Sequence, residues 1–141
     1  MNPARQRLIG KVDPAEEVRL FESGDFNPEG FDHEAHVRVA WCYLEQYPAA
    51  VAIARFTSAL RTLTVRLGAS DKYHETITWF FMIMIAERRA ACSPGDWEGF
   101  RNANRDLLEG SAFLKRHYSR NRLDSTDARR HFLLPDLLPQ N

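Results

Sequence analysis

Residues 72–91 read Lys72-Tyr-His-Glu-Thr-Ile-Thr-Trp-Phe-Phe-Met-Ile-Met-Ile-Ala-Glu-Arg-Arg-Ala-Ala91, and this stretch decides the fold class. Taken alone, its apolar run from Trp79 to Ala86 could form a buried strand. The whole stretch, however, contains no proline or glycine over its length, and such a length favours a helix. Because the segment is apolar nearly all round, we expect it to be the central helix of a bundle or to meet a partner subunit.

The segments on either side also predict helices. The clearest amphipathic pattern follows Pro48, where apolar residues recur at intervals of three and four until Gly68. The sequence predicts a helix from Pro14 to Glu22 with Asp13 as its cap, a helix from Asp32 to just before Pro48, and Asp71 as the cap of the 72–91 helix. It also predicts a helix from Asp96 to Gly110, another from Ser111 to Tyr118, and a short helix after Ser125. A loop from Gly24 to Gly30 and a proline-rich tail from Leu133 to Pro139 complete the chain. The sequence therefore predicts an all-α, compact helical bundle of four to five main helices.

Length and charge limit the classes of protein that this chain can belong to. At 141 residues it is expected to be one domain, with an N-terminal helix and loop (1–30), a three-helix core (31–92) and C-terminal helices and tail (93–141). Its 19 basic and 19 acidic residues cancel, which argues against a nucleic-acid or membrane partner. Two cysteines without paired spacing and a start without an apolar leader predict a cytoplasmic protein.

Three histidines are the strongest candidates for chemistry. His33 and His36 lie three residues apart at the start of one predicted helix, and His74 begins another. Short connections make consecutive helices antiparallel, so these two helices are expected to run parallel with their starts at one end. Three imidazoles at that end would hold one divalent transition metal (Zn, Fe, Cu or Ni) and leave coordination positions open for substrate. A helix N-terminus also favours the neutral imidazole that a metal ligand requires.

A metalloenzyme with this mononuclear site is the leading hypothesis from the sequence. Glu75 is the candidate general base, and Arg38, Tyr73 and Thr78 are candidates for binding a small-molecule substrate, with an anionic substrate as one option. Zinc would support hydrolysis or another Lewis-acid reaction, and iron or copper would support oxygen chemistry. The same histidines could instead be helix-start residues bonded to the backbone. The alternative function is a non-enzymatic module that uses the apolar helix 72–91 to form a homodimer or to bind a ligand.

Basic residues also gather near the C-terminus, between residues 115 and 130. The pattern indicates either a solvated surface or a site for an anionic group.

The motifs Phe31-x-His33-x-x-His36-x-Arg38-x-Ala40-Trp41 and Lys72-Tyr-His-Glu-Thr-Ile-Thr78, followed by Tyr118-Ser119, Ala128-Arg129 and Pro135-Asp136-Leu137, resemble those of a family of small bacterial helical proteins. The resemblance spans residues 31 to 139. It implies that the histidine segments form a unit, and it implies no particular activity or substrate.

Overall fold

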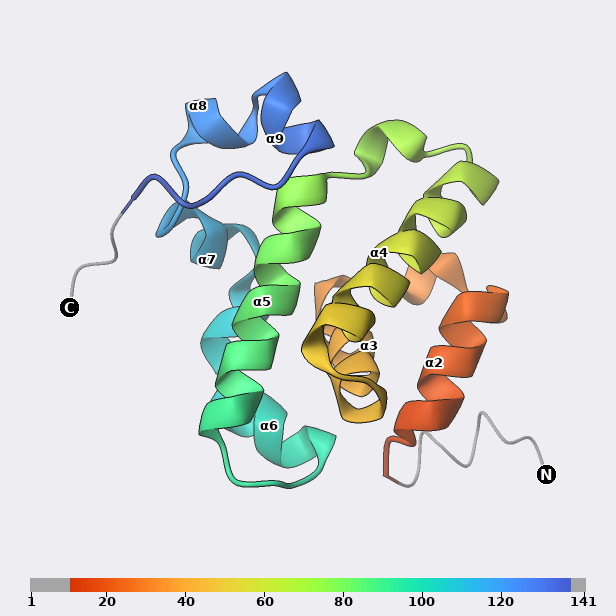
Figure 1. Cartoon of the computed structure of the whole chain (residues 1–141). Helices are drawn as coiled ribbons and strands as arrows, with labels where there is room; N and C mark the ends of the chain where they lie inside the picture. The colour runs from red at the N-terminus through yellow and green to blue at the C-terminus, as the bar shows by residue number, and fades with distance from the viewer. Residues whose placement is uncertain (1–10, 138–141) are drawn as a thin grey trace.

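The computed structural model describes residues 11–137, and those residues form only helices and turns. The all-α fold expected from the sequence is confirmed (Figure 1). The α-helices are α2 (Pro14–Ser23), α3 (His33–Gln46), α4 (Ala49–Arg66), α5 (Glu75–Ala91), α6 (Trp97–Ala103), α7 (Ser111–Lys115), α8 (Arg120–Leu123) and α9 (Thr126–Arg130). The 3-10 turns are η1 (Pro28–Gly30), η2 (Ser70–Lys72) and η3 (Arg105–Glu109). Predictions for residues 1–10 and 138–141 lie outside the described residues.

Side-chain caps begin three helices where the sequence places them. Asp13, Asp32 and Asp96 each accept a hydrogen bond from the backbone N–H three residues later. Such a bond satisfies one of the donors that the first turn of a helix leaves unpaired. Gly24 ends α2 in the left-handed region, at φ +77°, where a glycine carries no steric penalty. No helix between residues 11 and 137 is long and apolar enough to cross a membrane.

The start of α5 differs from the prediction. Its cap is His74 and not Asp71, because residues 70–72 form the separate turn η2. His74 has an extended backbone, with φ −135°, and its Nδ1 accepts a hydrogen bond from Ile77 N–H. An imidazole nitrogen thus takes the place of the usual carboxylate or hydroxyl oxygen.

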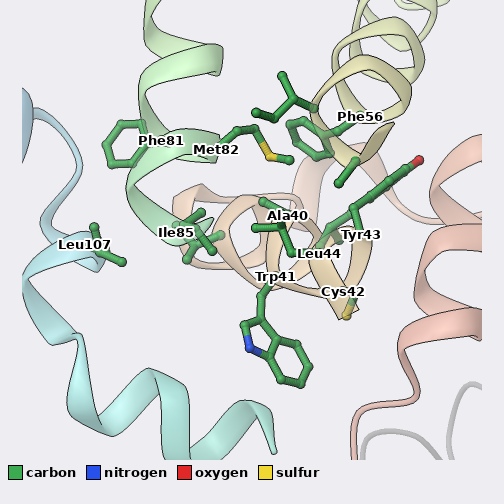
Figure 2. Close-up of a cluster of buried hydrophobic side chains, with 14 of the residues drawn as sticks. Ala40, Trp41, Cys42, Tyr43, Leu44, Phe56, Phe81, Met82, Ile85 and Leu107 are labelled. Carbon is green, nitrogen blue, oxygen red and sulfur yellow. The ribbon is translucent and has the colours of Figure 1, made fainter. Parts of the chain in front are cut away.

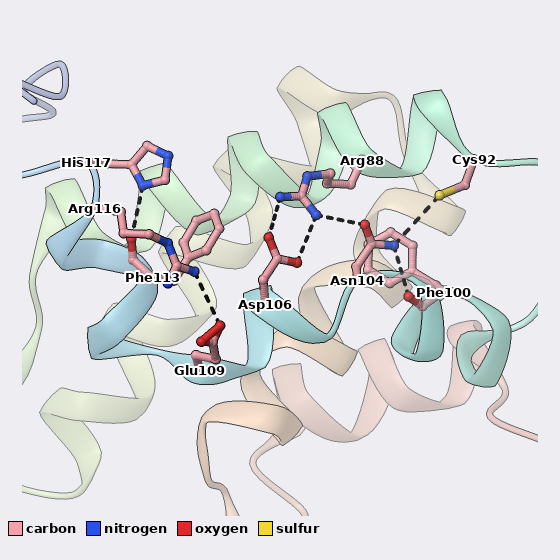
Figure 3. Close-up of polar contacts among 9 residues, drawn as sticks. All are labelled: Arg88, Cys92, Phe100, Asn104, Asp106, Glu109, Phe113, Arg116 and His117. Carbon is pink, nitrogen blue, oxygen red and sulfur yellow. Dashed lines mark hydrogen bonds and ion pairs between the residues drawn. The ribbon is translucent and has the colours of Figure 1, made fainter. Parts of the chain in front are cut away.

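The helix expected from Asp96 to Gly110 is interrupted at Asn104. This buried side chain donates to Phe100 O and accepts a hydrogen bond from Arg88 at 2.9 Å (Figure 3). Arg88 also forms a two-bonded ion pair with Asp106, at 2.6 and 3.0 Å. These contacts stabilise a non-helical backbone at Asn104, so α6 ends at Ala103 and η3 follows.

The central helix of the core is α3, and the expectation that helix 72–91 occupies this position is wrong. Every residue from Val39 to Leu44 is buried, and α3 contacts α2, α4, α5 and η3 (Figure 2). In α5, by contrast, Trp79 and Ile83 are only partly buried. The amphipathic α4 packs its apolar stripe, which includes Phe56, into the same core.

The C-terminal segment that includes α9 lies beside the N-terminal end of α5 (Figure 1). The hydroxyl of Thr76 donates to His131 O at 2.7 Å and accepts from Leu133 N–H at 3.1 Å. Tyr118 donates its phenolic hydroxyl to Leu133 O at 2.7 Å. The segment is thus held mainly through its own backbone.

Candidate functional site

The two histidines of α3 lie close together, with ring centroids 6.4 Å apart. His33 points its Nε2 at Leu107 O, 2.8 Å away, and its ring contacts Phe81 with a centroid distance of 4.7 Å. Since a carbonyl oxygen can only accept, Nε2 of His33 carries the proton. The first histidine of the predicted site therefore joins the start of α3 to η3.

His36 is surrounded by rings and forms no hydrogen bond with a described residue. Its centroid lies 5.1 Å from that of Phe56 and 5.8 Å from that of Phe31. Burial lowers the pKa of His36 to about 4, and the neighbouring His33 lowers it further in the same direction. The ring is therefore neutral at physiological pH.

His74 uses both ring nitrogens within the fold. Its Nδ1 caps α5, and its Nε2 lies 2.7 Å from Leu123 O. Because Nδ1 accepts and Nε2 donates, the geometry fixes one neutral tautomer. His74 thus connects the start of α5 to the end of α8.

The structure does not bring the three imidazoles together. Phe81, which contacts His33, is seven residues after His74. At 1.5 Å per residue this is roughly 10 Å along α5. The two helix starts are therefore offset along the bundle rather than level. Within residues 11–137 no three His, Cys, Asp or Glu side chains form a group that could hold a metal ion. The three-histidine centre stays a prediction, and this arrangement gives it no support.

Glu75 and Tyr73, the predicted base and one predicted substrate contact, belong to a polar cluster between α4 and α5. The Glu75 carboxylate accepts from Tyr73 Oη at 2.5 Å and from Arg61 Nη2 at 2.5 Å. Burial, followed by the bond to Glu75, raises the pKa of the Tyr73 phenol. Thr78, another predicted substrate contact, donates its hydroxyl to His74 O at 2.8 Å. All three side chains are therefore occupied by contacts within the fold.

Some of the basic residues near the C-terminus are tied to neighbouring groups. Arg129 donates to Asp71 O and Arg122 donates to Leu134 O, each at 2.7 Å. Arg116 pairs with Glu109 at 3.3 Å. Lys115 and Arg130 are exposed and make no hydrogen bond or ion pair with a described residue, so they stay accessible to solvent.

Arg38 is the predicted binding residue that lies at a pocket. The pocket has a volume of about 420 Å³ and lies between α2, the loop before α3 and the first half of α3. Its lining residues are Glu17, Leu20, Phe21, Asp25, Phe26, Asn27, Gly30, Phe31, Ala35, Arg38 and Val39. The three phenylalanines of this set pack on one another with centroid distances of 5.3 to 5.7 Å. We call this cavity the α2–α3 pocket.

The Arg38 guanidinium has N–H donors that make no hydrogen bond with a described residue. Its side chain is 30% exposed, and its Nε lies 3.6 Å from Glu17 Oε1, within ion-pair range but beyond a hydrogen bond. Among the described residues, Arg38 Nε is the one fully enclosed side-chain nitrogen or oxygen that has no hydrogen-bond partner. Leaving a buried donor unpaired costs about 1–3 kcal/mol. The Nη groups of the same guanidinium also make no hydrogen bond with a described residue, and because they are not fully enclosed, a ligand or water can add a contact there.

The aromatic wall of this pocket was not predicted from the sequence. Phe26 lies within the loop from Gly24 to Gly30, Phe21 precedes the loop and Phe31 follows it, and the three rings come together because that loop folds back between α2 and α3. The signal present in the sequence was Phe26 within, and Phe31 directly after, a loop otherwise rich in polar residues, glycine and proline.

Comparisons with protein-family models, curated proteins and solved structures find no match for this chain.

Proposed function

We propose that the chain is a small-molecule-binding protein and that the α2–α3 pocket is its binding site. The observation that carries the proposal is the Arg38 guanidinium, which lines an apolar pocket and makes no hydrogen bond with a described residue. Cavities that bind small molecules typically combine apolar walls with a few polar groups that fix orientation. The α2–α3 pocket has this composition, because three aromatic rings and one guanidinium are among its lining groups.

The chemistry of the pocket favours an amphipathic monocarboxylate. A volume of about 420 Å³ accommodates an aromatic ring with a short chain. The phenylalanine wall suits such an apolar body, and a carboxylate matches the fork of donors on Arg38. Two carboxylates, Glu17 at 3.6 Å from Arg38 Nε and Asp25, also line the pocket, so a ligand with a single negative charge placed at Arg38 fits better than a polyanion.

Matched probes with and without a charge test this proposal. We expect 4-phenylbutyrate to bind more tightly than 4-phenylbutanol in a calorimetric or NMR titration. The variant Arg38→Met removes a charge-assisted hydrogen bond and should weaken binding of the carboxylate by at least about tenfold, while leaving that of the alcohol nearly unchanged. Equal binding of both probes by the wild-type protein would contradict the assignment of Arg38.

Two further variants separate ligand binding from folding. Arg19→Met removes an exposed arginine that pairs with Glu16 outside the pocket, and should leave both affinities unchanged. Ala35→Leu extends a side chain of the pocket wall and should weaken both probes alike. If Arg38→Met fails to fold, Arg38→Lys keeps the charge but loses the planar fork, and we expect it to lower affinity for the carboxylate only.

A metal-dependent enzyme remains a second candidate, supported by the close pair His33 and His36. The ring of His36 is neutral at physiological pH and has no hydrogen bond to a described residue, which suits a metal ligand. Adding His74 requires that its bond to Leu123 O be broken. Elemental analysis of the purified protein tests this candidate. A stoichiometric metal that is lost in His36→Asn and in His74→Ala would support it, whereas metal-free protein, or content unchanged in both variants, would remove it.

A further inference from the structure

A second pocket lies on another side of α3, where the helix meets α5 and α6. Its volume is about 720 Å³, and none of its lining residues lines the α2–α3 pocket. Trp41 and Glu45 contribute from α3, Arg89 from the end of α5, and Asp96 and Phe100 from the start of α6. We call this cavity the Trp41 pocket.

The indole of Trp41 is the unusual wall of this pocket. Trp41 is only 4% exposed and packs against Trp97 and Phe100, with centroid distances of 5.9 and 6.4 Å. Figure 2 shows its ring extending from α3 away from Met82 and Ile85. A buried indole N–H usually has a hydrogen-bond partner.

The Trp41 N–H, in contrast, makes no hydrogen bond with any described residue. Within residues 11–137, Arg38 Nε is the single side-chain nitrogen or oxygen that is both fully enclosed and unpaired. The unpaired indole nitrogen of Trp41 is therefore not fully enclosed. The indole nitrogen therefore keeps some accessible surface, and Trp41 is one of the residues that line the pocket.

The charges at the rim restrict what the cavity can take. Arg89 pairs with Glu45 through Nε and Oε2 at 2.5 Å, so its positive charge is neutralised in place. Asp96 adds a further carboxylate, one oxygen of which accepts from Gly99 N–H at 3.0 Å. Arg89 is the only basic residue of the lining and already donates to Glu45, so the cavity offers an anion no free cationic partner.

We propose that the Trp41 pocket is a binding site for a planar nitrogen heteroaromatic molecule, uncharged or cationic, whose ring nitrogen accepts a hydrogen bond from the Trp41 indole. Trp41 and Phe100 contribute aromatic atoms to the wall against which such a ring system can pack. The lone pair of the heteroaromatic nitrogen supplies the acceptor that the indole lacks. This site is independent of the one proposed for the α2–α3 pocket and differs from it in the sign of charge that it prefers.

Quinoline, naphthalene and 2-naphthoate form a matched set of probes for this site. The three share one ring shape, but naphthalene lacks the acceptor and 2-naphthoate carries a negative charge. In a ¹H–¹⁵N spectrum we expect quinoline to shift the indole N–H resonance of Trp41 downfield, with the resonance assigned from its loss in Trp41→Phe. Quinoline should bind about threefold to tenfold more tightly than naphthalene, the increment of one neutral hydrogen bond.

Variants locate the binding and protect the test against a folding defect. Trp41→Phe should reduce the affinity for quinoline to that for naphthalene. Ala90→Phe places a ring in the pocket and should block both probes, whereas Ala91→Phe, at an exposed neighbour outside the lining, should not. The proposal is overturned if quinoline leaves the Trp41 resonance unmoved, if naphthalene or 2-naphthoate binds as tightly as quinoline, or if the two alanine variants behave alike. Because the probes for the α2–α3 pocket are not used here, failure of one site leaves the other untouched.

Discussion

Replacing His74 by alanine removes two hydrogen bonds that connect the start of α5 to the C-terminal helices. Loss of the cap on Ile77 N–H costs about 1 kcal/mol, and loss of the bond to Leu123 O costs about 1 kcal/mol more. The total of about 2 kcal/mol corresponds to a fall in melting temperature of roughly 5–10 °C for a chain of this size. We expect this loss in thermal and urea unfolding followed by circular dichroism.

The variant His74→Asn provides the matched comparison. Asparagine caps helices well but is too short to reach Leu123 O, so we expect it to lose only about half of the stability that His74→Ala loses. Both series are measured with and without EDTA. The hydrogen-bond account predicts the same losses in the two conditions. It is refuted if His74→Ala is as stable as the wild type, or if the loss appears only when metal is present.

Three further perturbations probe other features of the structure. The pKa of His36 is about 4 in the folded chain and about 6.5 in the unfolded chain, so between these pH values the unfolded chain binds one proton more than the folded chain. The stability that the neutral His36 ring contributes is therefore fully present above pH 6.5 and is lost as the pH falls through 4. The loss of about 3 kcal/mol should be absent in His36→Gln and retained in the exposed control His131→Gln, as urea titrations across this pH range will show. Arg88→Met breaks the paired bonds to Asp106 and should lower the free energy of unfolding by about 2 kcal/mol, measured by urea unfolding; an unchanged midpoint would mean that solvent screens this pair completely. Gly110→Ala places a side chain on a backbone with φ +62° and should lower the free energy of unfolding by about 1–3 kcal/mol in the same assay. Its Cβ would lie 3.4 Å from the His33 ring, an ordinary contact, so the cost would come from the backbone alone. An unchanged free energy of unfolding would show that the turn relaxes.

The helices could be predicted from the sequence because their start and stop signals are local. Asp13, Asp32 and Asp96 cap the helices that they were expected to cap. Where a boundary was wrong, a contact distant in sequence decided it. Asn104 ends α6 because it is buried and accepts a hydrogen bond from Arg88, sixteen residues earlier.

The identity of the central helix could not be predicted from apolar content alone. The stretch from Trp79 to Ala86 is the most apolar in the chain, yet α3 is enclosed on more sides. Burial of α3 depends on which helices surround it, since α2, α4, α5 and η3 all contact it. Periodicity along one segment does not contain this information.

The geometry of the candidate site also depends on contacts between segments that are distant in the sequence. The sequence predicted correctly that His33, His36 and His74 stand at helix starts. The assignment of Arg38 as a substrate-binding residue stays a prediction, and the structure places Arg38 at the α2–α3 pocket. The expected meeting of the imidazoles rested on parallel helices with level ends. Parallel direction follows from short connections, but the offset of His74 from the contact of His33 with Phe81 is set by packing. The bonds of His33 and His74 to carbonyl oxygens fit the reading of both as helix-start residues.

The way in which the C-terminal segment is held has a consequence for how this chain tolerates variation. Thr76, Tyr118 and Arg122 all donate hydrogen bonds to main-chain oxygens of this segment, which every residue type offers equally. A substitution at His131 or Leu133 leaves the accepting main-chain oxygen in place, whereas a substitution at one of the three donating side chains removes the hydrogen bond. Substitutions should therefore be tolerated more readily at the residues that supply these oxygens than at the three side chains that donate to them.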